Sequence, residues 1–176
     1  MIPRYGQPPV TGRHYRARPG AYGLLLRRGQ VLLTLQAGPE PDMQLPGGGI
    51  DPGESPIHAL HREVFEETGW AIASPRRIGA YRRYAWLPEY GYWAEKICTI
   101  WLAEPVVRRG DPVEPDHRAV WVPLADLPAA LSEPGARAFV TRLMKGGFLA
   151  QASRRHPDKA MSPTRRDRHG GVLSRR

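Results

Sequence analysis

The 176-residue sequence predicts a single α/β domain. Three observations favour this class: a capped helix at residues 56–68, strand-like apolar runs on both sides of it, and two helical segments between residues 128 and 145. Strands and helices that alternate along a chain are typical of α/β folds. The length is sufficient for one hydrophobic core, and we expect the domain to span residues 19–150.

Two apolar runs precede the helix. Residues 21–26 and 30–36 are rich in Leu and predict strands, while the Arg-Arg-Gly sequence at 27–29 predicts a short hairpin turn. A proline-containing loop follows, and residues 43–45 predict a short extended segment. This segment leads into Pro-Gly-Gly-Gly at 46–49, where glycine allows the backbone to approach a ligand closely.

The helix has a signal at each end. Ser55 is a favourable N-cap, and Pro56 occupies the first helical position, where its missing N–H costs nothing. Gly69 stands where a helix often ends with glycine. We therefore expect the helix to span residues 56–68.

Three glutamates share one side of this helix. At about 100° per residue, Glu63, Glu66 and Glu67 occupy an arc of roughly 100°. Like charges at this spacing destabilise a helix, and a hard cation such as Mg²⁺ relieves the repulsion because it prefers oxygen ligands. A solvated acidic face is the alternative. The adjoining arc is apolar and is expected to face the core: Ile57, Leu60 and Val64.

The second half of the chain alternates again. Residues 78–84, 92–102 and 119–123 predict strands, and residues 128–131 and 134–145 predict helices. Cys98, the single cysteine, lies in an apolar run and is expected to be a small core residue. One cysteine excludes an internal disulfide framework, which favours a reducing compartment. We find neither a membrane-length apolar run nor a signal-peptide segment, so we expect a cytoplasmic protein.

The net charge of +9 is concentrated at the two ends. Residues 1–18 carry +4 and no acidic residue, residues 151–176 carry +6, and residues 19–150 carry −1. We expect residues 1–18 to form a flexible basic arm and residues 151–176 a disordered basic tail. These ends make RNA a possible partner. A basic groove within the fold is not favoured.

The glycine loop and the helix together resemble the Nudix box of MutT-like Nudix hydrolases. The pattern is Gly, five residues, Glu, seven residues, then Arg-Glu-apolar-x-Glu-Glu-x-Gly-apolar. It is matched at every specified position by Gly48, Glu54, Arg62, Glu63, Val64, Glu66, Glu67, Gly69 and Trp70. The resemblance implies an α/β/α sandwich with a mixed β-sheet between helices, in which the last helix covers the face opposite the box helix.

The resemblance also implies an activity. Nudix hydrolases cleave a diphosphate linkage in nucleoside diphosphate-x compounds, and Mg²⁺ or Mn²⁺ is the expected cofactor. The implied metal ligands are Glu63, Glu66 and Glu67, with the carbonyl of Gly47. Arg62 is expected to orient a box carboxylate. Glu54 is expected either to do the same or to serve as an additional ligand.

Many Nudix enzymes have a further glutamate in the loop before the last strand, as a late metal ligand or general base. Residues 108–118 form this loop, and Glu114 is the matching candidate. Asp116 and Glu95 are alternatives. A solvated loop acid would serve neither role, so the resemblance alone leaves the general base open among these acids and the box carboxylates.

An aromatic and arginine-rich region follows the helix. Aromatic faces stack on bases, and Arg binds phosphate as a planar fork. The candidate nucleotide contacts are Arg82, Arg83, Tyr84, Trp86 and Tyr90. Core and cross-strand packing is the alternative for each. The substrate is a small nucleotide whose identity the pattern leaves open, as it does the oligomeric state.

Two other functions are compatible with this fold. A nucleotide-sensing module without catalysis usually has a broken box, whereas all the box glutamates are present here. An isoprenyl-diphosphate isomerase needs a cysteine at its site, and Cys98 is predicted on a buried strand. His58 and His61 lie on the helix without a metal-binding spacing, and we interpret them as structural.

Overall fold

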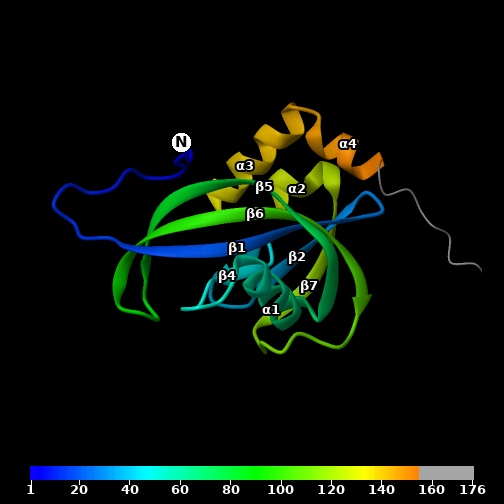
Figure 1. Ribbon diagram of the computed structural model, residues 1–176, viewed down its shortest axis with the longest axis horizontal. Helices are drawn as coiled ribbons and strands as arrows, with labels where there is room; N and C mark the ends of the chain where they lie inside the picture. Colours follow the sequence, from blue (N-terminus) through cyan, green and yellow to red (C-terminus); the bar gives the residue numbers. More distant parts are fainter. Residues whose placement is uncertain (155–176) are drawn as a thin grey trace, which may run out of the picture.

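The computed structural model describes residues 1–154, in which a mixed β-sheet lies between helices (Figure 1). The strands are β1 (Arg16–Arg27), β2 (Gln30–Gln36), β3 (Asp42–Gln44), β4 (Gly47–Gly49), β5 (Trp70–Leu87), β6 (Tyr92–Arg108) and β7 (His117–Pro123). The helices are α1 (Pro56–Thr68), the 3-10 helix η1 (Leu124–Asp126), α2 (Leu127–Ala130), α3 (Pro134–Lys145) and α4 (Phe148–Arg154). None of the helices in this part of the chain is long and apolar enough to cross a membrane.

The sheet has the order β3-β2-β1-β6-β5, with β4 paired to β1 and β7 paired to β2. The β1–β6 pair is parallel and the other pairs are antiparallel, so the sheet is mixed. β1 is central because it pairs with β6 along most of its length and with β4 and β2 on its other side. This arrangement brings the glycine strand β4 beside the middle of β1, at residues 20–22.

Side chains alternate between the two faces of β1 and supply two cores. Leu24 and Leu26 contribute to a core that includes Phe139 of α3, while Ala21 and Leu25 contribute to a core with Leu60 of α1. Helix α1 therefore covers one face, and α2, α3 and α4 cover the other (Figure 1). The expected α/β/α sandwich is confirmed.

Helix α1 has the expected bounds and caps. The Ser55 hydroxyl accepts a hydrogen bond from the His58 N–H, and Gly69 ends the helix with a φ of 72°. The buried stripe differs in its first turn. Ile57 is 43% exposed, whereas Ala59 is buried together with the expected core residues of the later turns.

The strands extend beyond their predicted bounds. β5 begins directly after α1 and continues to Leu87, with shifts in register on both sides of Pro75 that interrupt the alternation. β6 continues to Arg108 as its partner. Residues 47–49, expected in a loop, pair with β1 as β4. Pairing with a neighbouring strand determines these bounds, and it leaves no local signal in glycine- or arginine-rich sequence.

Both ends of the predicted domain are extended in the structure. The Tyr5 N–H donates to the Arg82 carbonyl (3.0 Å) and the Arg82 N–H donates to the Pro3 carbonyl (2.9 Å), so part of the expected flexible arm pairs with β5. β1 begins at Arg16, before the expected domain boundary at residue 19 and the expected strand at residues 21–26. Residues 151–154 complete α4, and the expected disordered tail from residue 155 onward lies outside the described residues.

Phe139 tests the core between the sheet and α3. Its ring is 2% exposed, lies 5.8 Å from the Tyr81 ring and fills the space above Gly79. We expect Phe139→Ala to lower the free energy of unfolding by about 3–5 kcal/mol, measured by urea denaturation. Val113→Ala, at a 64% exposed position, is the control. Equal effects of the two substitutions would contradict this core assignment.

Candidate active site

The glycine loop and helix α1 meet at two carboxylates. Gly47 has a φ of 140°, which favours glycine, and its N–H donates to Oε2 of Glu67 at 3.0 Å. At Gly48, a Cβ would lie 2.6 Å from the carboxyl carbon of Glu63, so only glycine leaves room for this side chain. The two glycines therefore determine where Glu63 and Glu67 lie.

Arg62 connects the carboxylates of the box. Its Nε and Nη2 donate to the two oxygens of Glu54, each at 2.9 Å, which is a bidentate pair. Its Nη1 donates to Glu63 (2.8 Å) and Glu66 (3.1 Å), and Nη2 also donates to the Gly49 carbonyl (3.2 Å). One guanidinium thus links α1 to the glycine strand and orients two box carboxylates.

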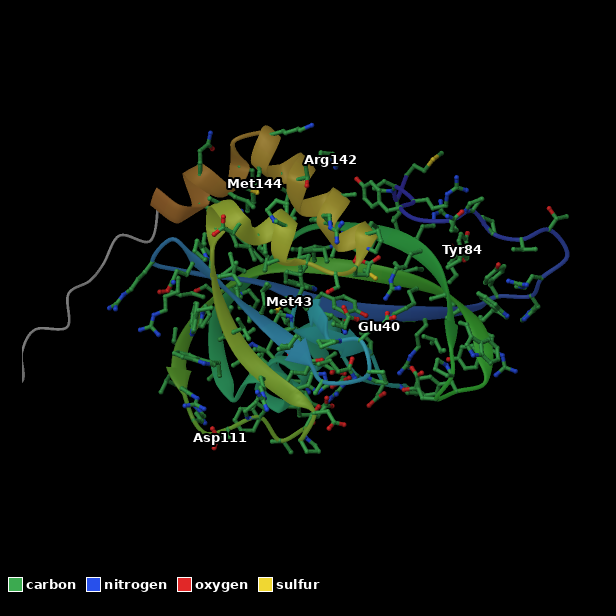
Figure 2. All side chains as sticks on the ribbon, turned by 180° about the vertical axis from the view of Figure 1, so that it is seen from behind. Glu40, Met43, Tyr84, Asp111, Arg142 and Met144 are labelled. Carbon is green, nitrogen blue, oxygen red and sulfur yellow. The ribbon has the colours of Figure 1, made fainter. Side chains whose placement is uncertain are left out.

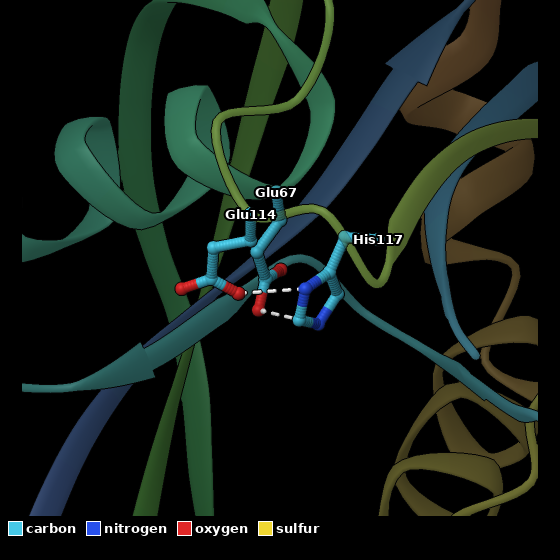
Figure 3. A group of neighbouring side chains, drawn as sticks. All are labelled: Glu67, Glu114 and His117. Atoms are coloured by element: carbon cyan, nitrogen blue, oxygen red, sulfur yellow. Dashed lines mark ion pairs between the residues drawn. The ribbon is translucent and has the colours of Figure 1, made fainter. Parts of the chain in front are cut away.

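A second group of ligand atoms forms where the loop before β7 meets α1 (Figure 3). The potential ligand atoms of Glu67, Glu114 and His117 all lie within 4.8 Å of one another. Oε2 of Glu114 lies 2.6 Å from Nδ1 of His117, and Oε1 of Glu67 lies 3.8 Å from Nε2. Such a group of carboxylates and imidazole could hold a metal ion.

Backbone hydrogen bonds hold this loop against the end of α1. The carbonyl of Glu66 accepts from the N–H groups of Val113 (2.7 Å) and Glu114 (3.2 Å). The carbonyl of Glu114 then accepts from the His117 N–H (3.1 Å). The unpaired carbonyl of a helix end is thereby satisfied, and Glu114 is brought beside Glu67.

Burial and repulsion between neighbouring carboxylates destabilise the charged forms of Glu63 and Glu67. Burial raises the pKa of Glu67 well above its ordinary value, and the charges of Glu63, Glu114 and Glu66 raise it further. Burial likewise raises the pKa of Glu63. By contrast, hydrogen bonds from Arg62 lower the pKa of Glu54 to about 2. A divalent cation between these carboxylates would remove the penalty, so the residues present fit a metal site.

A cleft of about 370 Å³ lies on the outer side of the glycine loop. Its walls carry both charges and aromatic rings, including Arg18, Tyr22, Glu63, Tyr90, Lys96 and Glu114. Burial lowers the pKa of Lys96, and the nearby Arg83 lowers it further. The cleft thus brings carboxylates and cationic side chains together.

Comparison with known protein families identifies the fold and the site together. The model of the NUDIX domain matches residues 15–143, which is most of the chain.

The chain belongs to the Nudix family.

Individual relatives agree over shorter stretches. A putative 8-oxo-dGTP diphosphatase of Bacillus subtilis is 42% identical over 64 residues, which is 36% of this chain and 43% of that protein. An RNA pyrophosphohydrolase of Proteus mirabilis is 39% identical over 80 residues, 46% of this chain and 42% of that protein. The chain therefore covers less than half the length of these relatives. The crystal structure of a MutT NUDIX hydrolase from Burkholderia pseudomallei has a TM-score of 0.58, 26% identity, and covers 73% of this chain and 98% of that one.

The Nudix box residues are therefore distributed over two connected groups. Glu63 and Glu66 lie with Glu54 around Arg62, whereas Glu67 lies with Glu114 and His117. Both oxygens of Glu54 accept hydrogen bonds from Arg62. This arrangement fits the orienting role expected of Glu54.

The expected nucleotide contacts are less well placed, because of the five only Tyr90 lines the cleft. Arg83 is half-buried near Glu133 (3.7 Å) on the α3 side of the sheet. Arg82 and Tyr84 contact Glu95 on the opposite face of β5 (3.2 and 3.5 Å), and Figure 2 shows Tyr84 beside the N-terminal segment.

Trp86 is the remaining expected contact. It packs on Trp93 with ring centroids 5.7 Å apart and does not line the cleft. Neighbouring residues of β5 point to opposite faces. Arg82, Tyr84 and Trp86 therefore share the face turned toward Glu95 and Trp93, whereas Arg83 lies on the other face near Glu133.

The three candidates for the late metal ligand or general base lie at different places in the fold. Glu114 lies beside Glu67 and lines the cleft. Glu95 is paired with Arg82 (3.2 Å), and Asp116 is exposed. Glu114 is the candidate that the fold brings to the box.

The sequence did not predict several residues of the site. His117 stands three residues after Glu114, and that E-x-x-H spacing was an available signal. Arg18 was assigned to a flexible arm, while Tyr22 and Lys96 lay within predicted strands. Their shared position became visible only through the parallel pairing of β1 with β6.

A larger hollow of about 600 Å³ lies on the other side of Glu114 and His117, lined by Trp70 and Trp121. It is not lined by the glycine loop, Arg62 or Glu63. We assign the site to the smaller cleft, because the glycine loop, Arg62 and Glu63 line it.

Glu67→Gln tests whether the carboxylates are crowded. A carboxyl whose pKa is higher in the folded than in the unfolded protein makes stability fall as pH rises from the unfolded value through the folded one. In EDTA at pH 8 we therefore expect Glu67→Gln to be more stable than the wild type by roughly 1 kcal/mol, or about 2–4 °C in Tm. The difference should shrink toward pH 4.

Glu40→Gln, at an exposed position outside the site, is the matched control and should not change Tm. A lower Tm for Glu67→Gln than for the wild type at pH 8, with no dependence on pH, would contradict the assigned crowding.

Proposed function

We propose that this Nudix chain hydrolyses the diphosphate linkage of nucleoside diphosphate-x compounds and requires Mg²⁺ or Mn²⁺. The observation that carries the proposal is the convergence of the box carboxylates, held by Arg62 and the glycine strand, beside Glu114 in a cleft lined by both acidic and cationic side chains. The names of the relatives, a diphosphatase and a pyrophosphohydrolase, support the reaction type.

The proposed metal ligands are Glu63, Glu66 and Glu67, with the carbonyl of Gly47. Bound there, the cation would withdraw charge from the phosphate oxygens and lower the pKa of the attacking water. Arg62 keeps Glu63 and Glu66 oriented, and the Gly47 N–H keeps Glu67 oriented. Positioning and neutralisation of charge are the main demands of phosphoryl transfer.

The nucleotide would lie along the rest of the cleft. Lys96 and Arg18 line it together with Arg62 and are suited to phosphate oxygens, while Tyr22 and Tyr90 offer ring faces for a base. These residues replace four of the five contacts expected from the sequence.

In the proposed reaction, the oxygen of water forms a bond to one phosphorus as the bond from that phosphorus to the bridging oxygen breaks. Glu114 accepts the proton of the water, and Nδ1 of His117 lies 2.6 Å from that carboxylate. Glu114 is favoured over the carboxylates of Glu63 and Glu66 because those accept hydrogen bonds from Arg62. Two phosphorylated products then leave the cleft.

The alternatives have less support. The intact box glutamates disfavour a binding module without turnover. Isoprenyl-diphosphate isomerisation would need a cysteine at the site, and Cys98 is 2% exposed within the α3-side core.

Substitution of the box tests the reaction. We expect Glu66→Gln and Glu67→Gln each to lower kcat about a hundredfold or more, or about 3 kcal/mol in the barrier, because the carboxylates act on the transition state. Release of phosphate or pyrophosphate from nucleoside triphosphates, dinucleoside polyphosphates and ADP-ribose is the measurement. Glu40→Gln should retain full turnover, and near-normal kcat in both box variants would rule out the proposed roles.

Removal of the metal gives an independent test. We expect turnover to be lost in excess EDTA and restored when Mg²⁺ or Mn²⁺ is added back, with far-UV circular dichroism unchanged throughout. Full turnover in the chelated protein would contradict the metal site.

A further inference from the structure

His117 places a buried imidazole against two carboxylates. Its side chain is only 9% exposed, and its two ring nitrogens face different residues. Nδ1 lies 2.6 Å from Oε2 of Glu114, and Nε2 lies 3.8 Å from Oε1 of Glu67. Figure 3 shows the imidazole beside both carboxylates. We call these three residues the Glu–Glu–His group.

One nitrogen of this imidazole lacks a hydrogen bond. Nδ1 of His117 has no hydrogen-bond partner among residues 1–154, because its close contact with Glu114 does not have hydrogen-bond geometry. A buried nitrogen without a partner costs free energy. Two atoms that bind the same ion also lie close together without a hydrogen bond between them. The unpaired nitrogen therefore indicates a ligand that the group receives from outside the chain.

Backbone groups, rather than arginine, hold the two carboxylates of the group. The Gly47 N–H donates to Oε2 of Glu67 (3.0 Å), so Oε1 is the atom that faces His117. A turn closed by the His117 N–H and the Glu114 carbonyl (3.1 Å) brings these two side chains together. In the part of the chain that the structure describes, both glutamates form ion pairs with His117, whereas the other box glutamates pair with Arg62. The group thus keeps carboxylate oxygens available for a cation.

The distances within the group suit a small tetrahedral ion. Zn²⁺ binds carboxylate oxygen and imidazole nitrogen at about 2.0–2.2 Å, which places the ligand atoms of one ion roughly 3.3–3.5 Å apart. The ligand atoms of the group all lie within 4.8 Å of one another. Side-chain movements of about an ångström would bring them to one ion, with a fourth position left for water.

The larger hollow gives an ion a route to the group. Glu114 and His117 line this hollow of about 600 Å³, together with Trp70 and Trp121. Neither the glycine loop nor Arg62 lines it, so the route is separate from the cleft proposed for the nucleotide. An ion could therefore reach the group while a nucleotide occupies the cleft.

The imidazole determines which ion the group prefers. Mg²⁺ prefers oxygen ligands in octahedral geometry. Imidazole suits Zn²⁺, and sites that combine nitrogen and oxygen ligands generally bind Zn²⁺ more tightly than Mn²⁺. The Glu–Glu–His group therefore favours Zn²⁺ over the two ions proposed as the cofactor.

We propose that the Glu–Glu–His group binds Zn²⁺ and that the bound ion inhibits the hydrolysis. The inhibition rests on the proposed function, in which Glu114 accepts the proton of the attacking water. A carboxylate bound to a cation is a weaker base, because the cation stabilises its charged form. The ion would also hold Glu67, which is one of the proposed Mg²⁺ ligands. Zn²⁺ at this position would therefore act against the proposed cofactor.

Zinc affinity is the first test and needs no substrate. The full chain is stripped of metal, and the Kd for Zn²⁺ is measured in excess Mg²⁺ by competition with a chromophoric zinc chelator. We expect His117→Gln to raise this Kd about a hundredfold or more, because loss of a residue that only supports a ligand already costs about 10–100-fold. His117→Cys should retain tight binding, since a thiolate is also a zinc ligand. A purely structural role of His117 would not be rescued in this way.

His58→Gln is the matched control. His58 is an exposed histidine on α1 outside both the cleft and the larger hollow, and its substitution should leave the Kd for Zn²⁺ within about twofold of the wild type. X-ray absorption at the zinc edge gives a second readout, which does not depend on the folding of a variant. With one Zn²⁺ bound to the wild type, we expect scattering from a single imidazole together with oxygen ligands.

Inhibition is measured next, with Mg²⁺ and the nucleotide substrates of the proposed function. The rate of each variant in free Zn²⁺ well above the wild-type Kd is divided by its own rate without Zn²⁺. We expect this ratio to fall about tenfold or more in the wild type and in His58→Gln, because the general base is lost. In His117→Gln the same concentration of Zn²⁺ should leave the ratio close to one.

The outcomes separate the zinc site from the proposed function. If His117→Gln and His58→Gln have the same Kd for Zn²⁺, or if the zinc of the wild type has only oxygen ligands, the site is overturned. If Zn²⁺ binds through His117 but leaves turnover unchanged, the inhibition is overturned. If no substrate is hydrolysed with Mg²⁺ alone, the proposed function fails, and the Kd values and the absorption spectrum still decide the zinc site.

Discussion

The crowding of carboxylates at the end of α1 is the constraint on which the rest of the site depends. Glu67 is 8% exposed and Glu63 lies against a glycine, yet both face further carboxylates. Burial of like charges costs free energy. The fold nevertheless maintains this arrangement with a bidentate Arg62–Glu54 pair, a backbone N–H from Gly47 and a loop anchored on the Glu66 carbonyl. So much structural support for an unfavourable arrangement is explained if a cation completes it.

The fold follows from the same requirements. Two glycines without side chains allow β4 to approach α1, and their pairing with β1 fixes the glycine strand at the centre of the sheet. The parallel β1–β6 pair then brings Lys96 beside Arg18, on a face opposite the one that packs against α1. Carboxylates and cations nevertheless line one cleft beside the glycine strand, although they come from segments far apart in the sequence. The proposed catalytic end and the proposed nucleotide end are both consequences of one sheet topology.

Local signals in the sequence predicted the elements that have local causes. The bounds of α1 follow from Ser55, Pro56 and Gly69, and those of α3 from a proline start and the glycines after it. The strand lengths did not follow, because β5 and β6 stabilise each other through residues such as Arg76 and Arg77 that have no strand signal of their own. The N-terminal segment appeared featureless for the same reason, since its hydrogen bonds are made to β5. Tertiary pairing is invisible to a local pattern.

The candidate site divides in the same way. The spacing of the box predicted Arg62 and its carboxylates, because one helix and one loop hold them at fixed offsets. Of the five expected nucleotide contacts only Tyr90 lines the cleft, because a local pattern shows neither the face nor the position that each of the others takes on β5. Register shifts near Pro75 change that face, and no composition rule reveals them. His117 and Lys96 join the site only through the folding of distant strands.

The most direct measurement of the central claim is the anomalous scattering of Mn²⁺ in crystals grown with that ion. If crowded carboxylates exist to hold a cation, an anomalous peak should appear between the carboxylates of α1 and Glu114, within ligand distance of Glu67. Crystals that contain Mn²⁺ at other positions, with these carboxylates protonated or paired only to Arg62 and His117, would contradict the account.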